Sequence, residues 1–201
     1  KTTIVNLLSR FYNTDSGCVR IDGQDISKVT LHSLRTQMGV MMQDSFIFGG
    51  TIMDNIRYGN KTATDEEVIR AAKTVCAHDF IMQMEDGYQT QVNERGSRLS
   101  VGQRQLISFA RALLADPAIL ILDEATSSID TETEIVLQEG LNHLLKGRTS
   151  FIIAHRLSTI QNADCIMYIS DGGIAEAGTH EELLQKHGKY YELYEAQYKS
   201  V

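Results

Sequence analysis

The sequence lacks several features that would have assigned it quickly to a class. Its 201 residues include one proline, three cysteines and no tryptophan, with no internal repeat or low-complexity tract. No apolar run approaches the roughly 18 residues that a membrane-spanning helix requires, so we expect no direct membrane insertion by this segment. An odd number of widely spaced cysteines argues against a disulfide framework. We expect Cys18, Cys76 and Cys165, which have apolar neighbours, to be buried thiols of a reducing compartment.

Positive charge is also in short supply. The chain carries 19 Lys and Arg against 26 Asp and Glu, which gives a net charge of −7. A nucleic-acid surface needs clustered cations to neutralise phosphates, so this balance predicts no nucleic-acid partner. The hydrophobic share of 42% and the charged share of 22% are typical of a soluble globular protein. A chain of this length can bury a sizeable core as one large domain or two small ones.

What is present is an alternation of apolar strands and amphipathic helices. The patterns predict helices at 2–12, 64–76, 79–84, 101–114 and 132–145, with two more after Thr179 and from about Lys189. They predict strands at 38–42, 118–122, 150–154, 165–169 and 174–177, and a hairpin around Asp22-Gly23. Such alternation predicts an α/β protein with a mostly parallel sheet covered by helices on both faces.

Two segments carry most of the chemical information. Residues 118–122 are apolar and lead directly into Asp123 and Glu124, which predicts a buried strand that ends in two carboxylates. Ligands bind at that end of the strands in open α/β sheets. One carboxylate can hold Mg²⁺, and the other can orient or deprotonate a water. The run Leu99-Ser100-Val101-Gly102-Gln103 starts a predicted helix, whose free N–H groups favour a phosphate.

In this order, the two segments resemble the signature sequence and the Walker B motif of ABC-transporter nucleotide-binding domains. The run from Ile47 to Ile52 further resembles exporter-type members, in particular bacterial multidrug or lipid exporter half-transporters. The resemblance implies a P-loop NTPase-like, mostly parallel sheet flanked by helices. It also implies an inserted α-helical signature subdomain at about 51–115, and ATP with Mg²⁺ as ligands.

The first residues match the end of the phosphate-binding pattern G-x-x-x-x-G-K-[ST]. Lys1 would reach the β- and γ-phosphates, and the Thr2 hydroxyl would ligate Mg²⁺. By resemblance, Thr3 would lie near the α-phosphate. We therefore expect residues 1–201 to form a nucleotide-binding domain that is truncated within this motif, without its P-loop glycines and N-terminal strands. The chain by itself is then expected to be inactive.

The resemblance assigns the remaining residues of the site. Gln43 would contact Mg²⁺ and the attacking water, and Asp123 would bind the metal. Glu124 would be the general base, and His155 would lie beside the γ-phosphate as a switch. Asp130 would belong to the D-loop, which contacts the opposite subunit.

The family also implies two partners. Two such domains pair head-to-tail, so Ser100, Gly102 and Gln103 would close over ATP held by the second domain. A transmembrane domain would receive the work of ATP hydrolysis, which places this domain at the cytoplasmic face of the plasma (inner) membrane. Val101 replaces a usual glycine where backbone approaches phosphate. This departure suggests a heterodimeric exporter in which this chain keeps the catalytic glutamate.

Several alternatives stay open. The chain could be a catalytically silent fragment, or a DNA-maintenance ABC ATPase, although no coiled-coil insertion interrupts the motifs. Phe46 and Phe48 are equally compatible with core packing and with contact to a coupling helix of the membrane domain. For the stripe of Tyr190, Tyr194 and Tyr198, packing within the chain is favoured over a dimer contact.

Overall fold

The computed structural model describes residues 2–42, 45–93, 96, 98–123, 130–154 and 157–198. The chain divides into two compact units, Thr2–Ile153 and Ala154–Val201. In the first unit the strands are β1 (Arg20–Ile21), β2 (Gln24–Asp25), β3 (Met38–Met41), β4 (Gly50–Thr51), β5 (Gln91–Val92), β6 (Ile119–Asp123) and β7 (Thr149–Ile153). Its α-helices are α1 (Thr2–Leu8), α2 (Leu31–Arg35), α3 (Ile52–Arg57), α4 (Asp65–Thr74), α5 (His78–Met82), α6 (Val101–Ala115) and α7 (Thr131–Leu145). Its described residues also form two short 3-10 helices, Ile26–Lys28 and Gly87–Gln89.

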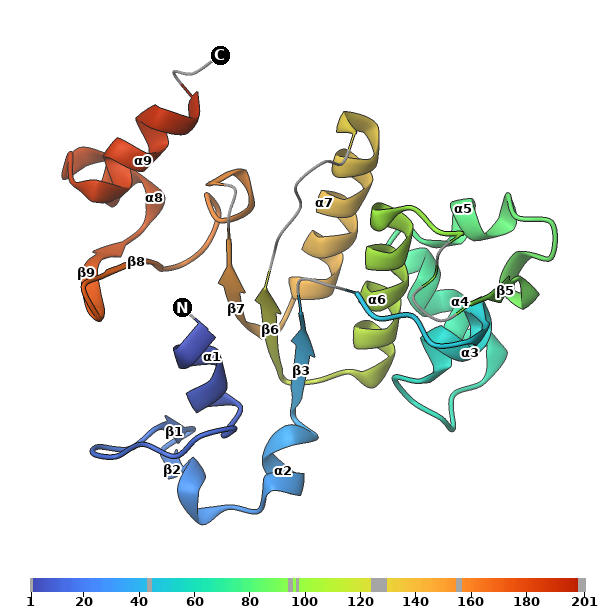
Figure 1. Ribbon diagram of the computed structural model, residues 1–201, viewed down its shortest axis with the longest axis horizontal. Helices are drawn as coiled ribbons and strands as arrows, with labels where there is room; N and C mark the ends of the chain where they lie inside the picture. The colour runs from blue at the N-terminus through green and yellow to red at the C-terminus, as the bar shows by residue number, and fades with distance from the viewer. Residues whose placement is uncertain are drawn as a thin grey trace. The chain divides into compact units, whose positions relative to one another are not determined.

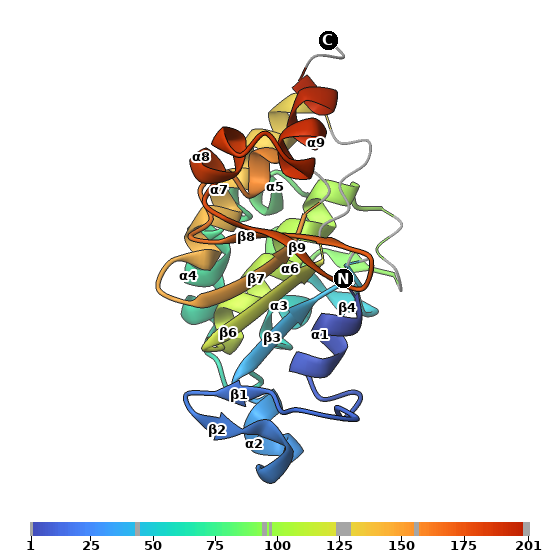
Figure 2. The ribbon, with the colours of Figure 1, turned by 90° about the vertical axis from the view of Figure 1, so that its left-hand side faces the viewer.

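A parallel sheet with the order β3-β6-β7 organises the first unit. The three strands run side by side in the same direction (Figure 2). Its register pairs Met41 with Leu122 and Asp123 with Ile153, so the strands end together at one edge. The mixed α/β architecture with a parallel sheet agrees with the predicted fold class.

The central strand β6 buries both of its faces. Ile119 and Ile121 pack with Val5 of α1, whereas Leu120 and Leu122 belong to a large core that includes Leu106, Phe109, Leu137 and Leu141 of α6 and α7. Helices therefore cover opposite faces of the strand (Figure 1). Consecutive strand side chains point to opposite faces, which explains why a continuous apolar run was needed here.

Between β3 and β6 the chain forms α3 to α6 and the small antiparallel pair β4-β5. Capping boxes begin three of these helices, at Thr51, Thr64 and Ser100, and in each the third helical residue returns a bond to the cap. The sequence predicted the box at Thr64. The strand pair and α3 were not predicted, because β4 and β5 have two residues each and α3 has six.

The second unit contains β8 (Ile166–Ser170), β9 (Gly173–Gly178), α8 (His180–Gln185), α9 (Lys189–Tyr198) and a short 3-10 helix, Leu157–Thr159. The two strands form an antiparallel hairpin. Tyr190 is 1% exposed in a core with Leu157, Ile166 and Leu183, and Tyr194 packs against that core. Packing within the chain is thus confirmed for these two tyrosines.

Two expectations were wrong. The first helix ends at Leu8 instead of residue 12, because Arg10 adopts a left-handed backbone with φ of 51° and donates its guanidinium to the Ile26 and Val29 carbonyls. The cysteines are free, as expected, but Cys18 and Cys165 are exposed and Cys76 is half-buried. Apolar sequence neighbours did not bury them, since Cys18 and Cys165 lie just before short strands and not within the core.

Gly59 permits a close approach of α6 to the end of α3. A Cβ atom at this position would overlap the backbone carbonyl oxygen of Arg111 and lie 3.3 Å from the nitrogen of Ala115. Backbone cannot move aside as a flexible side chain can, so Gly59→Ala should lower the free energy of unfolding by about 1–3 kcal/mol. Thermal unfolding of the protein measures this change.

Gly173→Ala is the control, because a Cβ there would meet no atom within 4 Å. Equal melting temperatures for the two variants would contradict the packing described here.

Candidate functional site

The strands β3, β6 and β7 end together at the carboxyl edge of the parallel sheet, where the sequence predicts the site. Asp123 is the last residue of β6, between the ends of β3 and β7, and its side chain is half-buried. Residues 43, 124 and 155 follow the ends of β3, β6 and β7 in the chain. The predicted roles of Gln43, Glu124 and His155 lie outside the described residues, as does that of Lys1.

Helix α1 presents its first residues toward the same edge. Val5 packs against Ile119 and Ile121 of β6, and the N-terminal end of α1 lies on the side where the strands end (Figure 1). Thr2 and Thr3, in the first turn, are exposed. Thr2, which begins α1, and Asp123, which ends β6, thus lie toward the same edge of the sheet.

The donor set at this edge suits a hard divalent cation. A hydroxyl and a carboxylate supply oxygen ligands, which Mg²⁺ prefers, and such sites usually keep several waters. Among the described residues, no group of three or more His, Cys, Asp or Glu side chains could enclose a metal ion. Of the described residues, Thr2 and Asp123 are the two that could supply oxygen ligands to a magnesium ion at this edge.

Ser100 and Gln103 form a closed capping box at the start of α6. The Ser100 Oγ accepts a bond of 3.1 Å from the Gln103 backbone N–H, and the Gln103 Oε1 accepts one of 3.0 Å from the Ser100 N–H. These bonds leave the Ser100 hydroxyl hydrogen and the Gln103 side-chain NH₂ as donors. The N–H groups of Val101 and Gly102 have no intrahelical acceptor, as in the first turn of any α-helix. The helix start can therefore offer several donors to an anion.

Val101 and Gly102 face different surroundings. The Val101 side chain is 47% exposed in the first turn of α6. Gly102 is buried, and a Cβ atom there would overlap the Cγ2 atom of Thr133 in α7. The contact with Thr133 was not predicted, because the two residues are distant in sequence. In the sequence, only the glycine at the second position of the predicted helix indicated a close contact there.

Asp130 is the N-cap of α7, and Thr133 links it to Gly102. Its carboxylate accepts a bond of 2.9 Å from the Thr133 backbone N–H. Hydrogen bonds from Thr133, first the backbone and then the side chain, lower the pKa of Asp130 below its ordinary value of 3.8. The structure thus brings Ser100, Gly102, Gln103 and Asp130 into neighbouring first turns of α6 and α7.

The segment before α3 exposes one aromatic ring and covers another. Phe46 is 51% exposed, and its ring packs edge-on against Phe48 at 4.9 Å between centroids. Phe48 is half-buried against Tyr58, with 4.4 Å between ring centroids. Phe48 therefore packs within the chain, whereas Phe46 and Tyr58 leave aromatic surface exposed.

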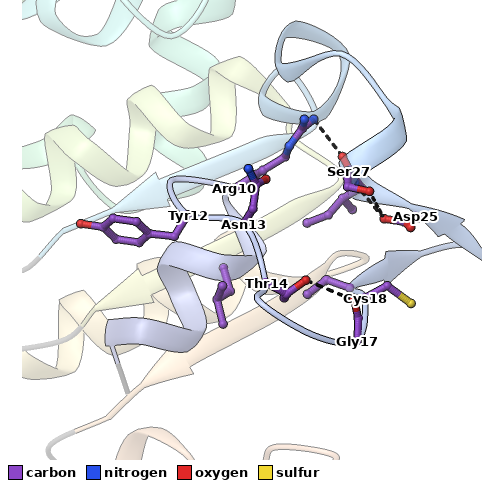
Figure 3. Close-up of a pocket in the computed structure, with 11 residues that line it drawn as sticks. Arg10, Tyr12, Asn13, Thr14, Gly17, Cys18, Asp25 and Ser27 are labelled. Atoms are coloured by element: carbon purple, nitrogen blue, oxygen red, sulfur yellow. Dashed lines mark hydrogen bonds between the residues drawn. The ribbon is translucent and has the colours of Figure 1, made fainter.

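A separate cavity of about 190 Å³ lies at the other end of α1, beside the β1-β2 hairpin (Figure 3). Three of the polar side chains that line it make hydrogen bonds within the chain. Arg10 donates to the Ile26 and Val29 carbonyls, Thr14 donates to the Gly17 carbonyl, and Asp25 accepts from Ser27. None of the predicted site residues lines this cavity.

The chain is similar in sequence to ATP-binding proteins of ABC transporters. A family model described as ABC transporter matches residues 1–127. An uncharacterized ABC transporter ATP-binding protein of Bacillus subtilis, YknV, is 58% identical over 201 residues, which is 100% of this chain and 33% of that protein. An ATP-dependent lipid A-core flippase of Syntrophus aciditrophicus is 52% identical over 199 residues, 99% of this chain and 33% of that protein. The chain thus spans about a third of the length of these relatives.

The fold has a close match among solved structures. A bacterial Atm1-family ABC exporter with ATP bound superposes with a TM-score of 0.90 and 44% sequence identity. The match covers 98% of this chain and 35% of the other. No helix in the described part of the chain is long and apolar enough to cross a membrane.

The bond from Thr133 to Asp130 predicts a pH dependence. Because its folded pKa lies below 3.8, Asp130 stabilises the folded protein above that pH, and this contribution is lost as the pH falls through the folded pKa. An NMR titration of the Asp130 carboxyl carbon should therefore have its midpoint below 3.8.

Asp130→Asn is the control, because the amide oxygen can still cap α7 but does not titrate. A midpoint at or above 3.8 for the wild-type carboxyl would contradict the prediction.

Proposed function

Because the chain belongs to the ABC transporter family, we propose that it binds and hydrolyses ATP to power export across a membrane. One observation carries this proposal. Asp123 ends the central buried strand β6 at the edge where α1 begins with Thr2. A phosphate-binding helix start and a metal-binding carboxylate are the two halves of an NTPase site.

The residues of this edge would divide the work as follows. Lys1 and the first turn of α1 would hold the phosphates, while Thr2 and Asp123, with Gln43, would hold Mg²⁺. The metal ion would neutralise charge that develops on the phosphates. Glu124 would orient or deprotonate the attacking water, and His155 would contact the γ-phosphate. Phosphoryl transfer needs mainly positioning and charge stabilisation, which this arrangement can supply.

We further propose that the start of α6 acts on a nucleotide held by a second domain. The donors of Ser100, Gly102 and Gln103 would bind the phosphates of that nucleotide, with Asp130 beside them on α7. ATP would then contribute contacts to both domains and favour the closed dimer. Hydrolysis would remove those contacts and release it.

The exposed Phe46 and Tyr58 are the candidate contact with a transmembrane domain. Aromatic side chains are enriched in protein interfaces. Phe46 comes three residues after Gln43 in the sequence, and Tyr58 directly follows α3. A membrane partner would place the domain at the cytoplasmic face of the plasma (inner) membrane. The relatives named above, which are three times as long, have room for such a part.

We propose that residues 1–201 form most of one nucleotide-binding domain, with residues 51–115 as its helical part. A catalytically silent fragment is the rival interpretation. The form to assay is the full transporter, because this chain carries only the last residues of the P-loop pattern, Lys1 and Thr2. A DNA-maintenance ATPase is disfavoured by the acidic net charge of −7.

The first test of function removes the proposed base. In the full transporter, Glu124→Gln should lower ATP turnover by about 10²–10³-fold, because the amide cannot accept a proton, while Mg-ATP binding persists. Steady-state hydrolysis and nucleotide-binding measurements check the two effects separately. Glu132→Gln, in the first turn of α7, is the matched control and should leave turnover unchanged. A wild-type transporter that binds ATP without hydrolysing it would favour the silent rival.

Val101 generates a second test. Its exposed branched side chain stands where the partner's nucleotide would approach, so the site completed by this signature should hydrolyse poorly. We expect the purified complex to contain this chain and a different second chain. In a single-turnover experiment, one of two bound ATP molecules should become ADP while the other remains. Two identical chains that both hydrolyse their nucleotide would refute the heterodimer.

A further inference from the structure

Arg111 joins two segments that the proposed function assigns to different nucleotide sites. It lies on α6, three turns after the capping box of Ser100. Its Nη1 donates 2.9 Å to the Phe46 carbonyl, its Nε donates 2.9 Å to the Asn55 carbonyl, and its Nη2 donates 3.1 Å to the Asn55 Oδ1. One guanidinium thus binds both the segment before β4 and helix α3.

Asn55 fixes the same segment from the other side. It is 2% exposed, and its Oδ1 accepts from the Phe48 N–H at 2.9 Å while its Nδ2 donates to the Phe48 carbonyl at 2.9 Å and to the Thr51 carbonyl at 3.0 Å. Residues 46–48 are therefore held by side chains instead of by a strand or helix. Without Arg111, the Phe46 carbonyl would lose the hydrogen-bond donor that holds it.

The environment of Arg111 requires a guanidinium. The structure places no carboxylate within ion-pair distance of it in the described ranges. Burial lowers the pKa of Arg111, and the cation is compensated by carbonyl dipoles and by the faces of Phe48 and Tyr58, whose ring centroids lie 5.2 and 5.9 Å away. Lysine would keep the charge but not the planar fork that reaches three acceptors and stacks on rings.

The two joined segments lead toward different sites. Residues 46–48 begin three positions after Gln43, the proposed contact of this chain's own Mg²⁺ and attacking water. Helix α6 begins with Ser100, the proposed contact of the partner's nucleotide. An α-helix of this length is stiff along its axis, so a displacement at Arg111 reaches Ser100, about 16 Å away, with little loss.

We propose that Arg111 is a positioning residue that makes the segment after Gln43 and the helix of Ser100 move together. Nucleotide at one site would thereby set the position of the helix start that completes the other. This inference rests on the proposed function, because it needs two ATP sites that share each chain. It assigns Arg111 no contact with nucleotide.

The test is Arg111→Lys in the full transporter in lipid vesicles. The affinity for Mg-ATP at this chain's site should stay within about twofold, whereas turnover should fall by roughly tenfold to a hundredfold, since small misplacements of catalytic groups cost rates of this order. The Hill coefficient of hydrolysis against ATP concentration should fall toward one, because the sites no longer communicate. A merely structural loss would lower the amount of active protein without changing that coefficient.

Arg148→Lys is the matched control. Arg148 also donates hydrogen bonds to backbone carbonyls, those of Pro117 at 3.2 Å and Leu144 at 2.9 Å, and it forms an ion pair with Asp116. Arg148 directly precedes β7, whose first residue Thr149 pairs with Ile119 at the start of β6, and thus lies at the end of the sheet opposite to Asp123. Its loss should therefore leave both turnover and the Hill coefficient unchanged. Equal effects of the two substitutions would overturn the proposal.

A milder variant keeps the proposal testable if Arg111→Lys does not fold. Phe48→Leu removes the ring that lies 5.2 Å from the Arg111 guanidinium, keeps the three hydrogen bonds of Arg111, and should lower the Hill coefficient in the same direction, by less. Wild-type values for Arg111→Lys or for Phe48→Leu would refute the positioning role alone. Absence of ATP hydrolysis in the wild-type transporter would instead refute the proposed function.

Discussion

The packing of β6 on both of its faces is the constraint on which the first unit depends. Ile119 and Ile121 bind α1 to one face, and Leu120 and Leu122 bind α6 and α7 to the other. A strand paired on both edges and covered on both faces has no freedom to shift, since a one-residue slip would exchange the two faces. The position of Asp123 follows directly, because the strand that carries it cannot move relative to α1 or α6. Rigid burial at one end of the strand thus positions polar chemistry at the other.

A second constraint operates at the start of α6, where stability and ligand binding use the same groups. In the capping box, the backbone N–H groups of Ser100 and Gln103 donate to each other's side chains and stabilise the helix end. Such caps typically contribute about 1 kcal/mol, less than a charge-assisted bond to phosphate can offer. The box leaves the hydroxyl hydrogen, the amide NH₂ and the first-turn N–H groups available, so the helix end can be stable without ligand and still bind one. Gly102 cannot be replaced easily, because it lies against Thr133 at the point where α6 meets α7.

How much the sequence could predict depended on the range of the interactions. The strand at 118–122 and the helix at 101–114 were predicted to within one or two residues, because their apolar periodicity is a local property that burial reinforces. The first helix was predicted too long, since the tertiary bonds of Arg10 to Ile26 and Val29 override the helical pattern. For the site, the order of motifs predicted that Asp123 and the start of α1 belong together. The link from Arg111 to Phe46, 65 residues apart, left no periodic or motif signal from which it could be predicted.

The guanidinium of Arg111 shows why such a link suits communication better than an apolar contact would. Apolar surfaces slide over each other at little cost, whereas three directed bonds are lost together when the geometry changes. The bonds to the carbonyls of residues 46 and 55 and to the Asn55 amide oxygen, with the two ring contacts, are made together in one arrangement of α3 and α6. Any force that displaces the segment after residue 43 must therefore either carry α6 with it or expose a partly buried charge without its acceptors, and the second outcome is the more costly.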